Sequence, residues 1–233
     1  MMALTLDDVS VRYADTAKPV LTIASLDLPA GGQLAITGGS GSGKSTLVNV
    51  ITGLERLRQG HARWNGTDLA TLSEGARDRF RAAHIGLVMQ DFHLFPGLSA
   101  LDNILLPARL SRVATTECVA RAQDLMGRFG LERSQQPVET MSRGEMQRVA
   151  VARAVLRKPG VIIADEPTAS LDVEAGAAVA DLLLDLAETE GSTLVVVSHD
   201  ARLVERLPRR IELKNGVIVH DTAGSHKPAG GDA

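Results

Sequence analysis

One nine-residue stretch limits the possible folds of this chain more than any other feature. It reads Gly38-Gly39-Ser40-Gly41-Ser42-Gly43-Lys44-Ser45-Thr46. The stretch lies between a short strand pattern at 33–37 and a helical pattern at 44–53. Glycines let several backbone N–H groups point inward at the positive end of a helix, which is how phosphate-binding loops hold polyphosphates. A flexible glycine-serine turn is the alternative, and the flanking strand and helix disfavour it.

The chemistry of this loop depends on Lys44 and Ser45. In a phosphate-binding loop, the Lys44 ammonium would neutralise the β and γ phosphates of a nucleotide, and the Ser45 hydroxyl would ligate Mg²⁺. The stretch therefore predicts a site for a polyphosphate and its metal ion.

A pair of acids supplies the expected second half of such a site. The continuous apolar run at 161–164 is typical of a parallel strand covered on both faces, and it ends in Asp165 and Glu166. Open parallel sheets bind ligands beyond the carboxyl ends of their strands. Asp165 is therefore a candidate ligand of Mg²⁺, and Glu166 could accept a proton from the attacking water or orient it. An apolar run ending in two acids can also be an ordinary solvated strand end, and the phosphate-binding loop favours the functional interpretation.

Two further polar residues follow predicted strands. Gln90 comes after the strand pattern at 85–89, and His199 comes after the run at 194–198. Gln90 could reach the metal or the water, and His199 could donate a hydrogen bond near the γ phosphate. A surface glutamine and a structural histidine are the alternatives. Their shared position at strand ends favours one common site.

The other patterns predict the architecture around this site. Alternating apolar residues predict antiparallel strands at 4–11 and 20–28. The pair Asn215-Gly216 tolerates positive φ and predicts a hairpin between 211–213 and 217–219. We expect an α/β fold with a parallel sheet flanked by helices, an antiparallel β subdomain and a helical insertion.

The helical patterns lie mostly in one block. Residues 101–155 are largely helical in pattern, with a helix around 115–129 and interruptions at Pro107 and Pro137. An apolar helix is expected at 175–187. We predict one domain at 1–220, with a helical subdomain at about 91–155, followed by a flexible tail at 221–233 whose small and polar residues cannot bury enough surface to order themselves.

Composition excludes several classes of protein. The 25 basic and 28 acidic residues give a formal charge of -3, which argues against nucleic acid as a partner. The single Cys118 excludes an intramolecular disulfide and fits an apolar filler in a reducing compartment. The first ten residues lack the pattern of a signal peptide, and no stretch approaches the roughly 18 apolar residues of a membrane helix. We expect a chain that is soluble or attached to a membrane through another protein.

Taken in chain order, the motifs resemble those of the ATP-binding cassette ATPases, the nucleotide-binding subunits of ABC transporters. Beside the loop, Gln90, Asp165-Glu166 and His199, the resemblance rests on Met141-Ser142-Arg143-Gly144-Glu145, Met146-Gln147-Arg148 and Ser170-Leu171-Asp172. It extends over about 4–219. It implies the P-loop NTPase fold and the binding and hydrolysis of ATP with Mg²⁺.

The resemblance also implies roles for single residues. Tyr13 would stack on adenine, with an ordinary strand aromatic as the alternative, and Asp172 would help to couple two sites. Lys44, Gln90, Glu166 and His199 would act in catalysis. Ser45, Gln90 and Asp165 would hold the metal. Ser142, Gly144 and Glu145 would cover the ATP held by an opposite subunit.

The segment 141–145 departs from the usual Leu-Ser-Gly-Gly-Gln at Met141, Arg143 and Glu145. Met141 is a mild apolar exchange, and Glu145 is similar to variants of the family. Arg143 stands where glycine is expected, so it could crowd the closed dimer or could add charge near the phosphates as an arginine finger does. We expect slower turnover, and an Arg143→Gly variant with unchanged ATPase activity would contradict this.

The resemblance further implies two partners. Each site takes its second wall from another subunit, so a homodimer or heterodimer is required. The segment Asp91-Phe92-His93-Leu94-Phe95-Pro96-Gly97-Leu98 could form a groove for a cytoplasmic helix of a membrane subunit, or could be local core under the helical arm. A membrane subunit would place the chain on the cytoplasmic side of the inner membrane.

Within the family, the stretches 85–90, 92–106 and 164–172 look most like the branch of lipoprotein-release and macrolide-export ATPases. The expected function is to power export or extraction of a lipid, lipoprotein, drug or peptide. A regulatory ATPase that transmits force to cell-wall enzymes without transport is the alternative. A soluble relative acting on DNA or ribosomes is a third class, and its long coiled-coil or zinc insertions or second cassette are not found in this sequence.

Overall fold

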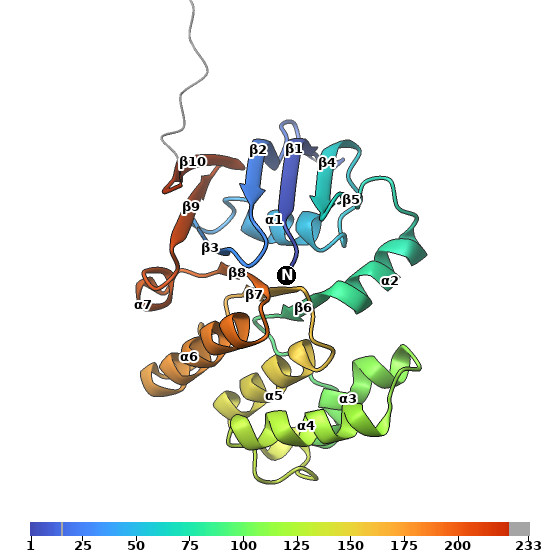
Figure 1. Cartoon of the computed structure of the whole chain (residues 1–233). Helices are drawn as coiled ribbons and strands as arrows, with labels where there is room; N and C mark the ends of the chain where they lie inside the picture. Colours follow the sequence, from blue (N-terminus) through green and yellow to red (C-terminus); the bar gives the residue numbers. More distant parts are fainter. Residues whose placement is uncertain (15, 224–233) are drawn as a thin grey trace, which may run out of the picture.

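The strands of the chain form two sheets, one antiparallel and one mostly parallel (Figure 1). The structure is a computed structural model that describes residues 1–14 and 16–223. The antiparallel sheet has the strand order β2-β1-β4-β5. Its members are β1 (Leu4–Val11), β2 (Leu21–Leu28), β4 (Gln59–Trp64) and β5 (Thr67–Asp68).

The second sheet forms the centre of the molecule and has the order β10-β9-β3-β8-β7-β6. Its members are β3 (Gln33–Thr37), β6 (Ile85–Val88), β7 (Val161–Asp165), β8 (Thr193–Val197), β9 (Arg209–Lys214) and β10 (Val217–Asp221). All neighbours pair in parallel except the hairpin of β9 and β10. The carboxyl ends of β3, β6, β7 and β8 therefore meet at one edge.

Helices cover both faces of this central sheet (Figure 1). The helices are α1 (Lys44–Ile51), α2 (Glu74–His84), α3 (Ala100–Leu110), α4 (Thr116–Arg128), α5 (Arg143–Val155), α6 (Val173–Thr189) and α7 (Ala201–Val204), with a 3₁₀ turn at Val138–Thr140. Helix α1 packs between the two sheets, and α3 to α6 pack on the other face. Each described helix is too short or too polar to span a lipid bilayer.

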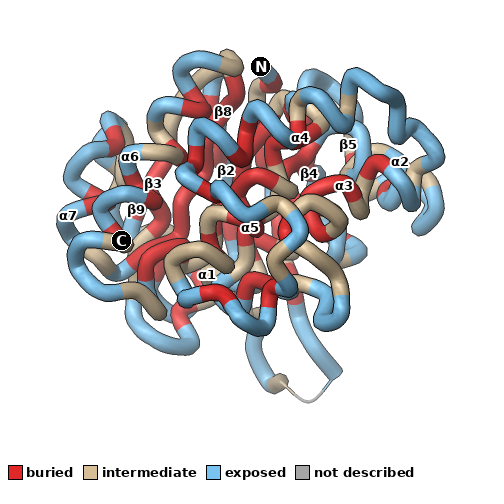
Figure 2. Tube along the Cα trace, turned by 90° about the horizontal axis from the view of Figure 1, so that it is seen from below, coloured by how far each residue is buried: buried red, intermediate tan, exposed pale blue. Residues whose placement is uncertain are grey.

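The two cores explain why the central strands are apolar throughout. Along β7, Ile162 and Ala164 join the core beneath α3 to α6, whereas Val161 and Ile163 join the core around α1. Side chains alternate between the faces of a strand, so a sheet covered on both faces needs an unbroken apolar run. Figure 2 shows buried residues along these inner strands and exposed residues on the outer loops and helices.

The predicted fold class is confirmed, and two details differ. Pro107 does not interrupt the helical block, because it lies within the last turn of α3, where its missing N–H removes one helical bond without ending the helix. Strand β10 continues to Asp221, one residue beyond the predicted domain end, because Asp221 pairs with Ile211. Residues 224–233 of the predicted flexible tail lie outside the described residues.

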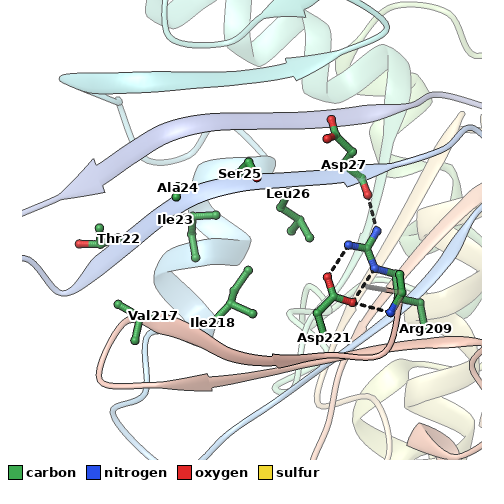
Figure 3. Close-up of a pocket in the computed structure, with 11 residues that line it drawn as sticks. Thr22, Ile23, Ala24, Ser25, Leu26, Asp27, Arg209, Val217, Ile218 and Asp221 are labelled. Carbon is green, nitrogen blue, oxygen red and sulfur yellow. Dashed lines mark hydrogen bonds and ion pairs between the residues drawn. The ribbon is translucent and has the colours of Figure 1, made fainter. Parts of the chain in front are cut away.

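Strands β2 and β10 approach each other and join the two sheets along a seam (Figure 3). The N–H of Thr22 donates to the carbonyl of Gly216 at 2.7 Å. Farther along, the strands enclose a cleft of about 430 Å³. The Arg209 guanidinium donates to both carboxylate oxygens of Asp221, at 3.0 and 2.6 Å, and to the carbonyl of Asp27. Arg209 therefore links the β9–β10 hairpin to β2 by hydrogen bonds, which helps to hold the antiparallel sheet beside the loop that follows β3.

Candidate active site

The glycine-rich loop connects β3 to α1 as the sequence predicts. Gly38, Gly41 and Gly43 have φ angles of 144°, 72° and 103°, in the region that side chains rarely adopt. A Cβ on Gly38 would lie 2.3 Å from the carbonyl oxygen of Leu213, so the tight curl requires glycine there. Gly43 is the N-cap of α1, and no side chain of the described residues caps that helix. Its first N–H groups therefore face the loop as donors.

The loop has the properties of a phosphate cradle. A Cβ built on Gly39 or Gly41 meets no described atom within 4 Å, so there is open space beside the loop at both positions. Lys44 Nζ donates to the carbonyls of Gly38 and Gly39 at 2.7 and 3.0 Å. The Ser42 hydroxyl is buried and has no hydrogen-bond partner in the described part of the chain. Buried polar groups are nearly always paired, so this orphan donor suits an anion.

Tyr13 lies next to this cradle. A cavity of about 270 Å³ is lined by Tyr13, Val20 and loop residues 41–46. Tyr13 is 41% exposed, and its hydroxyl donates to Glu55 Oε2 at 3.2 Å. An exposed ring beside a phosphate cradle is available for stacking on a base. Sequence reasoning missed Glu55, because nothing in its local pattern points to a partner 42 residues away.

The three predicted metal ligands come together. Ser45, Gln90 and Asp165 line one cavity of about 280 Å³, although they lie on α1, after β6 and at the end of β7. Hydroxyl, amide and carboxylate oxygens suit Mg²⁺, which usually takes one or two carboxylates together with phosphates and water. No group of three or more His, Cys, Asp or Glu in residues 1–14 and 16–223 offers an all-protein metal site. The donor set therefore fits a Mg²⁺ ion shared with a phosphate.

Burial perturbs the Asp165 carboxyl. Its pKa is raised, first because burial disfavours the charged form and second because Glu166 lies beside it, while Lys44 acts in the opposite direction. A bound divalent cation would relieve both of the effects that raise the pKa.

We predict that an Asp165→Asn variant is more stable than the wild type at pH 7 without ligand. A carboxyl whose folded pKa is raised contributes most at low pH and loses that contribution as the pH rises through the folded pKa, so at pH 7 the charge is a cost. We expect a Tm higher by about 2–4 °C. Calorimetry in a chelator should show the gain at pH 7 and not at pH 3. The exposed Asp124→Asn is the control, and an equal gain there would refute the assignment.

Glu166 and His199 form a pair at the same edge. His199 Nδ1 lies 2.8 Å from Glu166 Oε2, and the ring must donate there because a carboxylate only accepts. Glu166 adopts a left-handed φ of 49°, and its N–H donates to the carbonyl of Val197 at 2.8 Å. Such backbone strain in a non-glycine residue clusters at functional sites. The predicted convergence of strand ends therefore extends to these two side chains.

The segment around Ser142 lies elsewhere, at the start of α5, and lines neither of the cavities described above. Ser142 and Glu145 form a capping box, in which Ser142 Oγ accepts from the Glu145 N–H and Glu145 Oε2 accepts from the Ser142 N–H. The bond from the Ser142 N–H, followed by one that the Ser142 hydroxyl donates to Glu145 Oε2 at 2.8 Å, lowers the pKa of Glu145. A Cβ on Gly144 would lie 3.3 Å from Cβ of Ala175 on α6. Asp172 caps α6 by accepting from the N–H of Ala175 at 2.8 Å.

The α/β fold, the phosphate cradle and the acids at the strand ends define a nucleotide-binding protein of the P-loop class. A family model described as ABC transporter matches residues 21–169. The lipoprotein-releasing system ATP-binding protein LolD of Shewanella sp. (strain MR-7) is 40% identical over 219 residues, which cover 92% of this chain and 94% of that protein. The macrolide export ATP-binding/permease protein MacB of Bradyrhizobium diazoefficiens is 39% identical over 208 residues, which cover 89% of this chain and 32% of that protein.

Solved structures agree. The dimeric post-hydrolysis structure of the ATP-binding cassette MJ0796 bound to ADP and Pi matches with a TM-score of 0.86 and 33% identity, covering 94% of this chain and 97% of that chain. The chain belongs to the ABC transporter family and is an ATPase. It is an ATP-binding subunit of the transporter type, as the motifs predicted.

Proposed function

We propose that this chain binds Mg²⁺ and ATP at the 38–46 loop, forms a dimer on ATP and uses hydrolysis to drive a separate membrane protein. The observation that carries the proposal is one cavity lined by Ser45, Gln90 and Asp165 at the carboxyl edge of the central sheet. The Glu166–His199 pair lies at the same edge. Phosphate binding, metal binding and water activation are thereby served by neighbouring residues of one edge.

The residues divide the reaction as follows. Glu166 accepts a proton from the water that attacks the γ phosphorus, and the bond from that phosphorus to the bridging oxygen breaks to leave ADP and phosphate. Lys44 and the loop N–H groups hold the phosphates. His199 Nδ1 donates to the Glu166 carboxylate at 2.8 Å, and Nε2 donates near the γ phosphate when it also carries a proton. Ser45, Gln90 and Asp165 would hold Mg²⁺, which would neutralise charge on the phosphate oxygens.

The placement of the segment 142–145 supports the dimer. Ser142, Gly144 and Glu145 lie at the amino end of α5 and do not line the cavity beside the cradle of their own chain. They cover the nucleotide of a second subunit, and Asp172 at the start of α6 lies beside them. The relative MJ0796 is described as a dimer, which supports this arrangement.

The membrane partner is proposed from the relatives. LolD is named as the ATP-binding protein of a lipoprotein-releasing system, and MacB is named as an export ATP-binding/permease protein of which this chain spans about a third. We propose that the chain acts at the cytoplasmic face of the inner membrane. There it powers export or extraction of a lipid, lipoprotein, drug or peptide by a separate permease.

The test is Mg²⁺-dependent ATP hydrolysis by the purified chain, with and without detergent-solubilised candidate permeases from the same cell. We expect hydrolysis that needs Mg²⁺ and rises with one permease, which also co-purifies with the chain. Release of cargo from vesicles by that pair would support transport, whereas activation of cell-wall hydrolysis without release would point to the regulatory alternative. Absence of Mg²⁺-dependent hydrolysis in every combination would contradict the proposal.

A further inference from the structure

Three separate segments of the chain meet at Arg143, the first residue of α5. Its Nε donates to the carbonyl of Ser170 at 3.1 Å. Its guanidinium carbon lies 5.2 Å from the centroid of the Phe92 ring, within the range of a cation–π contact. From the sequence, Arg143 could either crowd the closed dimer or reach toward the phosphates. In the structure its guanidinium turns back onto its own chain.

The two contacts join the positions on which the proposed reaction depends. Phe92 lies two residues after Gln90, which lines the metal cavity, and Ser170 lies two residues before Asp172. Arg143 itself follows Ser142, which lines neither of the cavities at the proposed ATP site. The Arg143 side chain therefore connects its own segment, which would cover the ATP of the opposite subunit, to two others. These are the Gln90 segment at the ATP site of this chain and the segment that leads to Asp172.

Contacts from α5 fix the conformation of the chain at Phe92. Phe92 and His93 have φ angles of 58° and 47°, and two consecutive left-handed residues without glycine persist only where neighbours fix them. Arg153, near the other end of α5, donates to the carbonyls of both residues at 2.6 Å. The Phe92 ring is only 7% exposed. Two arginines of α5 therefore contact this turn: Arg143 contacts the Phe92 ring, and Arg153 binds the backbone carbonyls of Phe92 and His93.

We propose that Arg143 is a positioning residue that links the Ser142 segment to the Gln90 segment and to the Ser170 segment, so that the two ATP sites of the dimer close together. The inference rests on the proposed function, because it needs two sites that share these segments. Glycine, which the family resemblance places at this position, has no side chain with which to make either contact. The link is therefore a property of this chain and not of the motif.

Such a link has two opposite effects on the reaction. Joint closure makes ATP binding at one site favour closure at the other, which raises cooperativity. Opening after hydrolysis must break or shift the same contacts, which slows turnover. The slower turnover expected from the sequence then has a physical cause that involves neither crowding nor a charge on the phosphates.

The experiment compares the full-length wild type with Arg143→Gly, Arg143→Lys and Phe92→Leu. Arg133→Ala is the matched control, because it removes an arginine near the same end of α5. A guanidinium nitrogen of Arg133 lies 3.9 Å from Glu145 Oε1, whereas the contacts described for Phe92 and Ser170 are made by Arg143. Four quantities are measured: the Hill coefficient and the kcat of ATP hydrolysis, the ATP concentration for half-maximal dimerisation, and ADP affinity as a check on the fold.

We expect the Hill coefficient to fall from about 2, the number of sites in a dimer, to about 1 in Arg143→Gly and Phe92→Leu. We expect kcat to rise about twofold or more in Arg143→Gly, with ADP affinity unchanged. Arg143→Lys should be intermediate, because it keeps the charge but loses the planar donor. The double variant Arg143→Gly/Phe92→Leu should lose no more cooperativity than either single variant.

Several results would overturn the inference. They are a wild-type Hill coefficient near 1, cooperativity unchanged in Arg143→Gly, equal loss in Arg133→Ala, and additive losses in the double variant. Each can occur while the wild type still hydrolyses ATP and dimerises. Failure of the link is therefore distinct from failure of the proposed function, which would remove hydrolysis from the wild type itself.

Discussion

Replacement of Glu166 by glutamine is expected to lower the rate of ATP hydrolysis by about 10²–10⁴-fold. Glutamine keeps the size and a carbonyl acceptor for His199 but cannot take a proton from water. The lysine, the loop and the metal ligands are untouched, so ATP binding should persist. Under the proposed function, hydrolysis is the step that opens the dimer, so the variant should accumulate as an ATP-bound dimer.

Single-turnover hydrolysis and light scattering in Mg²⁺-ATP check the two halves of this expectation. Glu205→Gln is the control, because Glu205 is exposed and this substitution removes the same charge from the same type of side chain. Hydrolysis at the wild-type rate in Glu166→Gln would assign water activation to another group. Loss of hydrolysis without accumulation of a dimer would support Glu166 as the general base and would contradict ATP-driven dimerisation.

The candidate site was largely predictable because its residues follow strands in a parallel sheet. The positions of Asp165, Glu166, Gln90 and His199 are each set by a buried apolar run, and parallel pairing brings the ends of those runs to one edge. The sheet geometry therefore converts a one-dimensional pattern into a three-dimensional site.

Elements without a strong apolar pattern could not be predicted. In β4 only Ala62 and Trp64 are buried, and in α2 the one buried residue is Arg77. Arg77 Nε donates to the carbonyl of Gly53 at 3.0 Å, so this helix is held partly by a polar contact that no hydrophobic period can reveal. Periodicity detects burial of apolar side chains and is blind to an arginine that replaces one.

Long-range contacts of single side chains were equally inaccessible. Arg143 and Ser170 are 27 residues apart in the sequence. Arg143 and Phe92 are separated in the sequence by the two helices α3 and α4. The sequence showed only that an arginine stands where a glycine is expected. Whether such a side chain points outward or folds back depends on what the topology places within its reach.

Replacement of Lys44 by alanine is expected to weaken ATP binding by on the order of a hundredfold, the cost of removing one partner of a close charge pair. The ammonium lies at the start of α1, within 3.0 Å of two loop carbonyls, where it can reach the phosphates of a nucleotide in the cradle. Calorimetric titration with ATP measures the effect. The exposed Lys214→Ala removes the same charge elsewhere and should bind ATP normally.

The same bonds to Gly38 and Gly39 mean that Lys44 also holds the loop, so a weaker affinity has two explanations. Titration with adenosine separates them, because adenosine presents a base and no phosphate. If the lysine acts on phosphates, the variant loses ATP and keeps adenosine. If it only shapes the loop, Lys44→Arg should bind both ligands as poorly as Lys44→Ala. Equal ATP affinity in the wild type and Lys44→Ala would show that the phosphate assignment is wrong, and every role placed at this strand edge would need to be reassigned.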